Sequence, residues 1–362
     1  MQKILEIDGQ KVGDGQPPYI IAEMSGNHNG DIERAKKLIQ LAKQAGADAV
    51  KLQTYTAESM TFKGFQVEGG KTWQGLDLYK LYEEAHTPWD WFNELFSYAK
   101  SIGISIFSSP FDLAAVQLLE SLDCPAYKIA SNEMTDWPLV EAVIKTGKPV
   151  ILSTGTSTKK EVAETIKFIE KLGGRDRIIV LHCVSAYPAP AEDTYLGTML
   201  DIRDSFDVLA GLSDHTLGIA IAVAAVSLGA CVVEKHFTLD RADGGPDSTF
   251  SLEKPELVAL CEETKWAWNS LGGLTVRPLE MGTIKYGGDT NLKDKGIFTR
   301  QFWTIKNIEE GEIFSFENIK SIRAPVDSGA VKTMNYQSVI GSKAKTSLPK
   351  NKPVTLEAII KK

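Results

Sequence analysis

Polar and charged side chains recur at the ends of eight short apolar segments, and some of them could bind a phosphorylated acid. Lys51 and Lys128 each interrupt such a segment, and a buried lysine is costly unless an anion accompanies it. Ser153, Thr154 and Ser213 lie at the ends of other segments and offer neutral donors for phosphate oxygens. Two cations with hydroxyl donors suit a small molecule that carries both a phosphate and a carboxylate.

Two histidines, His215 and His236, follow or end the last two segments and could bind a divalent metal ion. Two imidazoles leave coordination positions for water and substrate oxygen, as in a Lewis-acid site rather than a closed structural site. These ligand types suit manganese, cobalt, zinc or iron, so the choice of metal stays open. Taken singly, a strand-end lysine is more often solvated and a lone histidine more often packs in a core. The prediction depends on their occurring together.

The segments that must position these residues are rich in Val, Ile and Ala, and each is followed by a stretch with helical periodicity. They cover residues 19–25, 49–54, 105–111, 126–131, 150–155, 178–185, 208–214 and 231–238. Nearly continuous apolar strands are typical of parallel strands that helices cover. Eight strand–helix repeats in roughly 260 residues predict an α/β fold, a TIM (β/α)8 barrel, over residues 1–271. An open doubly wound sheet is the alternative, but no Gly-x-Gly-x-x-Gly follows the first segment.

In a TIM barrel the carboxyl ends of all eight strands meet at one mouth, where active sites lie. The polar residues at the predicted strand ends are Glu23, Ser25, Lys51, Gln53, Ser108, Ser109, Lys128, Ser131, Ser153, Thr154, Ser185, Ser213, His215, Glu234 and His236. Residues two apart on a strand face the same side, so Lys51 is expected inside the barrel and Lys235 outside it. His182 is three residues before Ser185, so the two side chains face opposite sides of their strand, and His182 is expected to have a structural role.

Two regions interrupt or follow the repeats. Residues 57–91 form a long connection between the second and third strands, and such a loop at the mouth of a barrel usually covers the substrate. His86 lies within it and is an open candidate for a sugar contact. Residues 272–295 are rich in glycine and polar residues and predict a linker. Residues 296–362 predict a small separate domain of short strands and turns.

The bulk composition narrows the partners. The net charge is −7 and no block of Lys and Arg occurs, which disfavours nucleic acid or an anionic membrane as a partner. No apolar run approaches the ~20 residues of a membrane span, and residues 1–15 do not resemble a secretory signal. The four cysteines are far apart, without a CxxC pair, and are expected to be reduced. A cytoplasmic location is the expectation.

Several motifs, in order along nearly the whole chain, resemble the sialic acid synthase family. They are AEMSGNHNG (22–30), AGADAVKLQTYT (45–56), FSSPFD (107–112), YKIAS (127–131), STGTST (153–158), HCVSAYPAP (182–190), GLSDHT (211–216) and EKHFT (234–238). Members condense phosphoenolpyruvate with an open-chain amino sugar. Residues 81–92 and 241–253 resemble most the branch that makes pseudaminic acid, which implies 2,4-diacetamido-2,4,6-trideoxy-L-altrose as acceptor. Precursors of N-acetylneuraminate or legionaminate are the alternative sugars.

For the implied reaction we hypothesise that Glu23 is the base for the attacking water and that Asp247 or Glu234 assists with protons or the sugar. The resemblance itself implies further roles: Tyr187 matches a position near the substrate. Ser109, Ser131 and Ser185 match positions around the carboxylate. The metal is expected to be Mn²⁺, with Co²⁺ or Mg²⁺ as alternatives.

The family's fold, a TIM barrel followed by a small antifreeze-like (SAF) domain, implies a domain-swapped homodimer. In such a dimer an arginine from the C-terminal domain enters the site of the partner subunit. The matching residue here is Arg300, although its neighbours Thr299 and Gln301 depart from the family pattern.

Two rival interpretations remain. A class I pyruvate aldolase would use Lys51 or Lys128 to form a Schiff base and would need no metal. A non-catalytic carbohydrate-binding protein would bind sugar without releasing phosphate.

Overall fold

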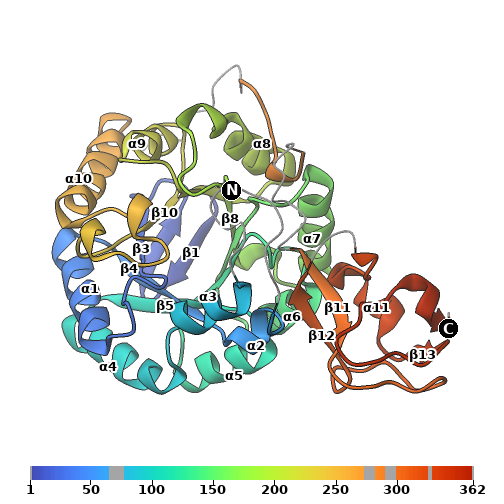
Figure 1. The fold of residues 1–362 in the computed structure, drawn as a ribbon. Coiled ribbons are helices and arrows are strands. Elements are labelled where there is room, and N and C mark those ends of the chain that lie inside the picture. The colour runs from blue at the N-terminus through green and yellow to red at the C-terminus, as the bar shows by residue number, and fades with distance from the viewer. Residues whose placement is uncertain (1, 65–76, 273–281, 290–298, 325–327, 361–362) are drawn as a thin grey trace.

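The computed structural model describes residues 2–64, 77–272, 282–289, 299–324 and 328–360 (Figure 1). Parts of the predicted covering loop and of the predicted linker fall outside these residues, as does the start of the predicted C-terminal domain.

Eight parallel strands close into a barrel, which confirms the predicted TIM fold (Figure 1). The strands are β3 (Tyr19–Glu23), β4 (Ala49–Thr54), β5 (Ser105–Pro110), β6 (Tyr127–Ile129), β7 (Val150–Ser153), β8 (Ile178–Cys183), β9 (Leu209–Asp214) and β10 (Val232–His236). Each pairs with its neighbours in chain order, and β10 pairs with β3 to close the ring. Several predicted segments run past the strand ends, so Ser25, Ser131 and Ser185 lie in the loops at the mouth.

Helices form the outer layer of the barrel. They are α1 (Ile32–Ala45), α4 (Phe92–Ile102), α5 (Leu113–Ser121), α6 (Trp137–Lys145), α7 (Lys159–Lys171), α8 (Gly197–Phe206), α9 (Ala220–Ser227) and α10 (Lys254–Ser270). Their boundaries follow local chemistry: the Asp31 side chain accepts from the first free N–H groups of α1, and Thr158 with Glu161 forms a capping box at α7. Two further helices, α2 (Ala57–Met60) and α3 (Leu78–Ala85), lie in the long connection after β4.

A hairpin that the periodicity did not predict precedes the barrel. Its strands are β1 (Ile4–Ile7) and β2 (Gln10–Gly13), joined by a turn at Asp8 and Gly9, both with positive φ. Lys3 contacts Asp207 just before β9, so the hairpin lies against the amino-terminal end of the barrel. That position is opposite to the mouth.

The chain after the barrel builds a second, smaller hydrophobic core. Its elements are β11 (Arg300–Thr304), β12 (Ile319–Arg323), α11 (Tyr336–Val339), β13 (Lys343–Ala344) and β14 (Ile359–Ile360). Phe302, Phe314 and Ile319 are fully buried in this core. β12 contacts α2, which places this part beside the barrel mouth (Figure 1). Its antifreeze-like identity stays a prediction. In the part of the chain that the structure describes, no helix is both long and apolar enough for a membrane span.

Candidate active site

The mouth of the barrel gathers the charged residues that the strand ends predicted. Lys51 Nζ lies 2.8 Å from Glu23 Oε2 and 3.7 Å from Glu234 Oε2. Lys128 Nζ lies 3.5 Å from the other oxygen of Glu234. All four side chains are at most 6% exposed. Two carboxylates therefore balance two ammonium groups in a water-poor environment. Because water screens charges poorly there, an anion that binds interacts strongly with all four groups.

Serine hydroxyls complete this charged cluster. Lys51 Nζ donates to Ser109 Oγ over 3.3 Å, and Lys128 Nζ donates to Ser153 Oγ over 2.6 Å. Ser213 Oγ donates to Glu234 Oε1 over 3.0 Å. Each lysine thus has a hydroxyl beside it that can also donate to a bound oxyanion.

A second group of hydroxyls converges on Gly155. A side chain at this glycine would put its Cβ 2.4 Å from Ser185 Oγ and 2.8 Å from Ser131 Oγ, so only glycine leaves room for both. The Gly155 N–H donates to Ser131 Oγ over 3.1 Å. Ser185 Oγ is buried and has no hydrogen-bond partner among the described residues. Such an orphaned hydroxyl donor suits a carboxylate or phosphate oxygen.

The electrostatics of the cluster separate its two carboxyls. Burial raises the pKa of Glu23 to about 7, although Lys51 opposes this shift. Burial also acts to raise the pKa of Glu234, but Lys128 and Lys51 outweigh it and lower the pKa. Burial lowers the pKa of Lys128. Glu23 is therefore the member that can gain or lose a proton near neutral pH.

The two predicted metal ligands lie side by side, with ring centroids 5.3 Å apart. His215 Nδ1 lies 2.8 Å from the Val184 carbonyl oxygen. With the proton on Nδ1 donated to this carbonyl, Nε2 keeps the lone pair that a metal ion needs. His236 Nδ1 is buried without a hydrogen-bond partner and lies 3.7 Å from Asp247 Oδ2. Burial, aided by His215, lowers the pKa of His236 well below its usual range, which keeps it neutral.

Among the described residues no three of His, Cys, Asp or Glu form a metal cluster. The pair fits an ion that takes its remaining ligands from substrate and water.

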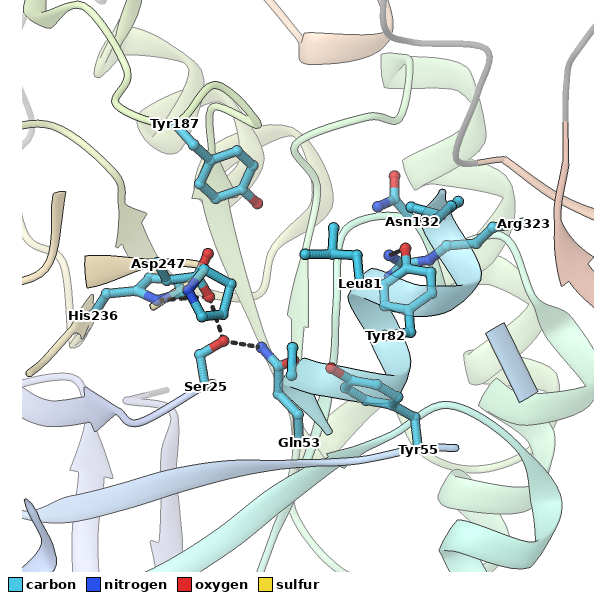
Figure 2. Close-up of a pocket in the computed structure, with 13 residues that line it drawn as sticks. Ser25, Gln53, Tyr55, Leu81, Tyr82, Asn132, Tyr187, His236, Asp247 and Arg323 are labelled. Atoms are coloured by element: carbon cyan, nitrogen blue, oxygen red, sulfur yellow. Dashed lines mark hydrogen bonds and ion pairs between the residues drawn. The ribbon is translucent and has the colours of Figure 1, made fainter. Parts of the chain in front are cut away.

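A cavity of about 160 Å³ opens beside this pair (Figure 2). One end carries His236, Asp247, Ser25 and Gln53. Ser25 links this end together, because it hydrogen-bonds Asp247 and accepts from Gln53 Nε2 over 3.1 Å. Gln53 Nε2 also donates to Glu23 Oε1 over 2.9 Å, so the cavity adjoins the charged cluster. Neither Lys51 nor Lys128 is among the described residues that line it.

The remaining lining residues were not singled out one by one. Leu78, Leu81, Tyr82 and Ala85 belong to the connection 57–91 that was predicted to cover the substrate, and Pro246 belongs to the segment 241–253. Tyr55, Asn132 and Arg323 complete the lining. Tyr187, which was predicted, also lines the cavity and packs on His215 with a centroid distance of 4.3 Å.

Arg323 lines the cavity, and Arg300 is not among the described residues that do. The role of Arg300 in the site of a partner subunit stays a prediction. Arg300 is fully buried, its Nε donates to Glu133 over 3.0 Å, and its Nη groups donate to the carbonyls of Ser59 and Phe111. Arg323 holds both oxygens of Glu133 at 2.9 Å and donates to the Tyr82 hydroxyl over 2.9 Å. The strand register pairs Arg300 with Arg323, so both side chains face the barrel.

Three other residues lie away from the cavity. Lys235 faces outward, as strand parity predicted, and pairs with Asp214 at 2.7 Å. His182 is buried and bonds the Thr194 carbonyl oxygen. His86 follows α3 and bonds the Glu83 carbonyl oxygen over 2.8 Å, so the structure does not place it against the cavity.

The chain is similar to several known proteins along nearly its whole length. Residues 38–275 match the model of the NeuB family. The chain is 39% identical to pseudaminic acid synthase of Helicobacter pylori, over 95% of this chain and 98% of that protein. It is 36% identical to N,N'-diacetyllegionaminic acid synthase of Campylobacter jejuni, over 89% and 94%. The crystal structure of spore coat polysaccharide biosynthesis protein SpsE of Bacillus subtilis superposes with a TM-score of 0.84 at 29% identity and covers 99% of both chains.

Proposed function

The chain belongs to the NeuB family, and from that premise we propose that it is an enzyme that makes pseudaminic acid. It condenses phosphoenolpyruvate with 2,4-diacetamido-2,4,6-trideoxy-L-altrose and water, and releases phosphate. The observation that carries the proposal is the pair of buried lysines, Lys51 and Lys128, set among hydroxyls beside two adjacent histidines.

Phosphoenolpyruvate has the charges that this cluster can accept. Lys51 and Lys128, with Ser153 and Ser213, would bind its phosphate. Ser109, Ser131 and Ser185 would bind its carboxylate. The internal ion pairs to Glu23 and Glu234 would be exchanged for contacts to the substrate, so little lysine desolvation remains to be overcome on binding.

The reaction forms one carbon–carbon bond and breaks one carbon–oxygen bond. C3 of phosphoenolpyruvate attacks the aldehyde carbon, whose oxygen takes up a proton, and C2 gains cationic character. Glu23, with its pKa of about 7, takes a proton from the water that adds to C2. The C2–O bond to phosphate then breaks while the proton of the new C2 hydroxyl passes to the departing phosphate, which leaves the ketone of the sugar acid and inorganic hydrogen phosphate. Asp247, whose pKa burial raises, supplies the proton for the aldehyde oxygen. Glu234, the other predicted candidate, has its pKa lowered by the two lysines and stays ionised.

We extend the proposal to a divalent metal ion, Mn²⁺ by preference, held by His215 and His236. When bound there, such an ion supplies a Lewis acid that polarises the aldehyde. The chain's own part is to orient His215 through the Val184 carbonyl and to keep His236 neutral through burial, which lowers its pKa.

A swapped homodimer, an antifreeze-like C-terminal domain and a cytoplasmic location stay predictions. In the single chain, Arg300 and Arg323 contact the barrel of the same chain. Two chains could make the same contacts by exchanging their C-terminal domains.

The test is phosphate release from phosphoenolpyruvate with each candidate acceptor, with and without a chelator. We expect release with the trideoxy-L-altrose, little release with N-acetylmannosamine, and loss with chelator that Mn²⁺ reverses. His215→Ala should abolish turnover. Near-normal kcat of His215→Ala after exhaustive metal removal would refute the metal proposal, and release only with another sugar would refute the acceptor.

The class I aldolase stays a rival because the lowered pKa of Lys128 is a property that Schiff-base lysines share. It predicts that borohydride traps pyruvate on the protein. We expect no trapping, because both lysines are held in ion pairs with Glu234.

A further inference from the structure

One face of α3 forms an apolar wall of the cavity, and its residues Leu81 and Tyr82 lie across from His236 (Figure 2). Leu78, Leu81, Tyr82 and Ala85 line the cavity, and their spacing of three and four residues puts them on one side of the helix. Lys80, Glu83 and Glu84, on the other side, are exposed. In Figure 2, Leu81 projects toward the cavity between Tyr187 and Tyr82.

The wall is held at three points, so it presents a fixed surface. Tyr79 contacts Glu58 of α2 through its hydroxyl. Tyr82 accepts a hydrogen bond from Arg323, which Glu133 holds in turn. At the end of α3, a Cβ on Gly26 would lie 2.7 Å from Pro246 and 3.2 Å from the Ala85 side chain, so the chain is closely packed there.

The α3 side chains Leu78, Leu81 and Ala85 offer a ligand no hydrogen-bonding group. The polar groups of the cavity belong to other elements: Ser25, Gln53 and Asp247 lie at the His236 end, Asn132 and Arg323 lie past Leu81, and Tyr187 and Tyr55 line the cavity with their rings and hydroxyls (Figure 2). Tyr82 has its hydroxyl turned to Arg323. A ligand group that sits against Leu78, Leu81 and Ala85 therefore meets carbon atoms.

The position of the reacting carbon orients the acceptor. Carbon–carbon bonding must occur where the cavity adjoins Glu23 and His236, so C1 of the acceptor lies there. The remaining carbons extend across the cavity, and C6 is the farthest from C1. In the proposed acceptor, C6 is a methyl group.

We infer that the α3 wall, and Leu81 above all, selects acceptors whose terminal carbon is a methyl group rather than a hydroxymethyl group. This inference rests on the proposed function. A hydroxyl at C6 would be buried against carbon without a partner, and an apolar site rejects an added hydroxyl by up to about 100-fold.

The test compares two acceptors that differ at one atom: 2,4-diacetamido-2,4,6-trideoxy-L-altrose and its analogue with a hydroxyl at C6. For the unaltered protein we expect kcat/KM to favour the methyl compound by about 10- to 100-fold. Leu81→Asn should bring the ratio to within about threefold of one, because the amide can pair with the hydroxyl. Leu81→Met should keep the preference, and so should Leu113→Asn, which makes the same change at an exposed position of α5.

The outcomes separate this inference from the proposed function. If neither acceptor gives phosphate release with the unaltered protein, the proposed function fails. If release occurs but Leu81→Asn lowers both values of kcat/KM by one factor, Leu81 contacts a part that both sugars share, and the inference is overturned. Should Leu81→Asn fail to fold, Ala85→Ser adds a hydroxyl to the same wall with little change in volume. An unchanged ratio for Ala85→Ser would then overturn the inference.

Discussion

Glu133 holds the C-terminal part of the chain against the barrel, and replacing it with glutamine tests how much that contact contributes. Its carboxylate lies 3.0 Å from Arg300 and 2.9 Å from Arg323, and Glu133 and Arg300 are fully buried. Burial acts to raise the pKa of Glu133, but Arg323 and Arg300 outweigh it and lower the pKa. Glu133 is therefore ionised at neutral pH, and the three residues together carry one net positive charge.

The magnitude follows from the charge that the substitution leaves behind. Glu133→Gln keeps the shape of the side chain but turns an NH₂ group toward one arginine. Among the described residues, Glu133 is the only carboxylate paired with Arg300 or Arg323, so the substitution leaves both guanidinium groups without an ion-pair partner. Removing one partner of a buried ion pair costs about 3–5 kcal/mol. The partly exposed pair between Lys332 and Glu161, 2.8 Å apart with the lysine 45% exposed, offers a comparison between the same two parts of the chain. Lys332→Ala should cost at most about 1 kcal/mol.

Urea unfolding of both variants gives the free energies, and hydrogen exchange across β11 and β12 shows whether the C-terminal part is released. Because Arg323 lines the cavity, Glu133→Gln should also raise the KM for the acceptor more than the KM for phosphoenolpyruvate. Equal unfolding free energies for Glu133→Gln and Lys332→Ala, with unchanged exchange, would refute the reasoning.

Two further predictions concern the mouth and the core. Lys51→Ala removes one cation from the proposed phosphoenolpyruvate site and should raise the KM for phosphoenolpyruvate by at least about 30-fold, since a buried charged contact is worth about 2–5 kcal/mol; steady-state kinetics with an unchanged KM would remove Lys51 from that site. Burial lowers the pKa of His182 to about 4, against about 6.5 when unfolded, so the unfolded chain binds the proton first. The stability from neutral His182 is thus present above pH 6.5 and lost as the pH falls to about 4, by up to about 3 kcal/mol. His182→Gln should flatten the dependence of unfolding free energy on pH in that range, and an unchanged slope would contradict the assignment.

The barrel and the charged cluster could be predicted from sequence because both depend on local patterns. Parallel strands place their carboxyl ends together, and strand parity then decides which side chains face inward. Lys51, Lys128 and Glu234 meet for that reason, and Lys235 faces outward. The hairpin before the barrel was missed, although Asp8–Gly9 between two alternating segments is a strong turn signal.

The length of the connection 57–91 predicted that this segment covers the site, but local patterns could not show which of its side chains line the cavity. Leu78, Leu81 and Tyr82 have the spacing of an ordinary amphipathic helix, which in isolation predicts burial against a core. Arg323 reaches the cavity because β12 pairs with β11 in one register and packs beside α2. Those are contacts between distant parts of the chain, and nothing in the sequence near Arg300 or Arg323 distinguishes which arginine lines the cavity.

The central claim is that the cluster at the mouth holds phosphoenolpyruvate while C3 attacks the aldehyde and water adds at C2. Phosphoenolpyruvate with heavy oxygen at the bridge between C2 and phosphorus tests it in one turnover. Cleavage of the C2–O bond predicts that the heavy atom leaves in inorganic phosphate. Retention of the heavy oxygen in the sugar acid would mean that the phosphorus–oxygen bond breaks, and would contradict the account.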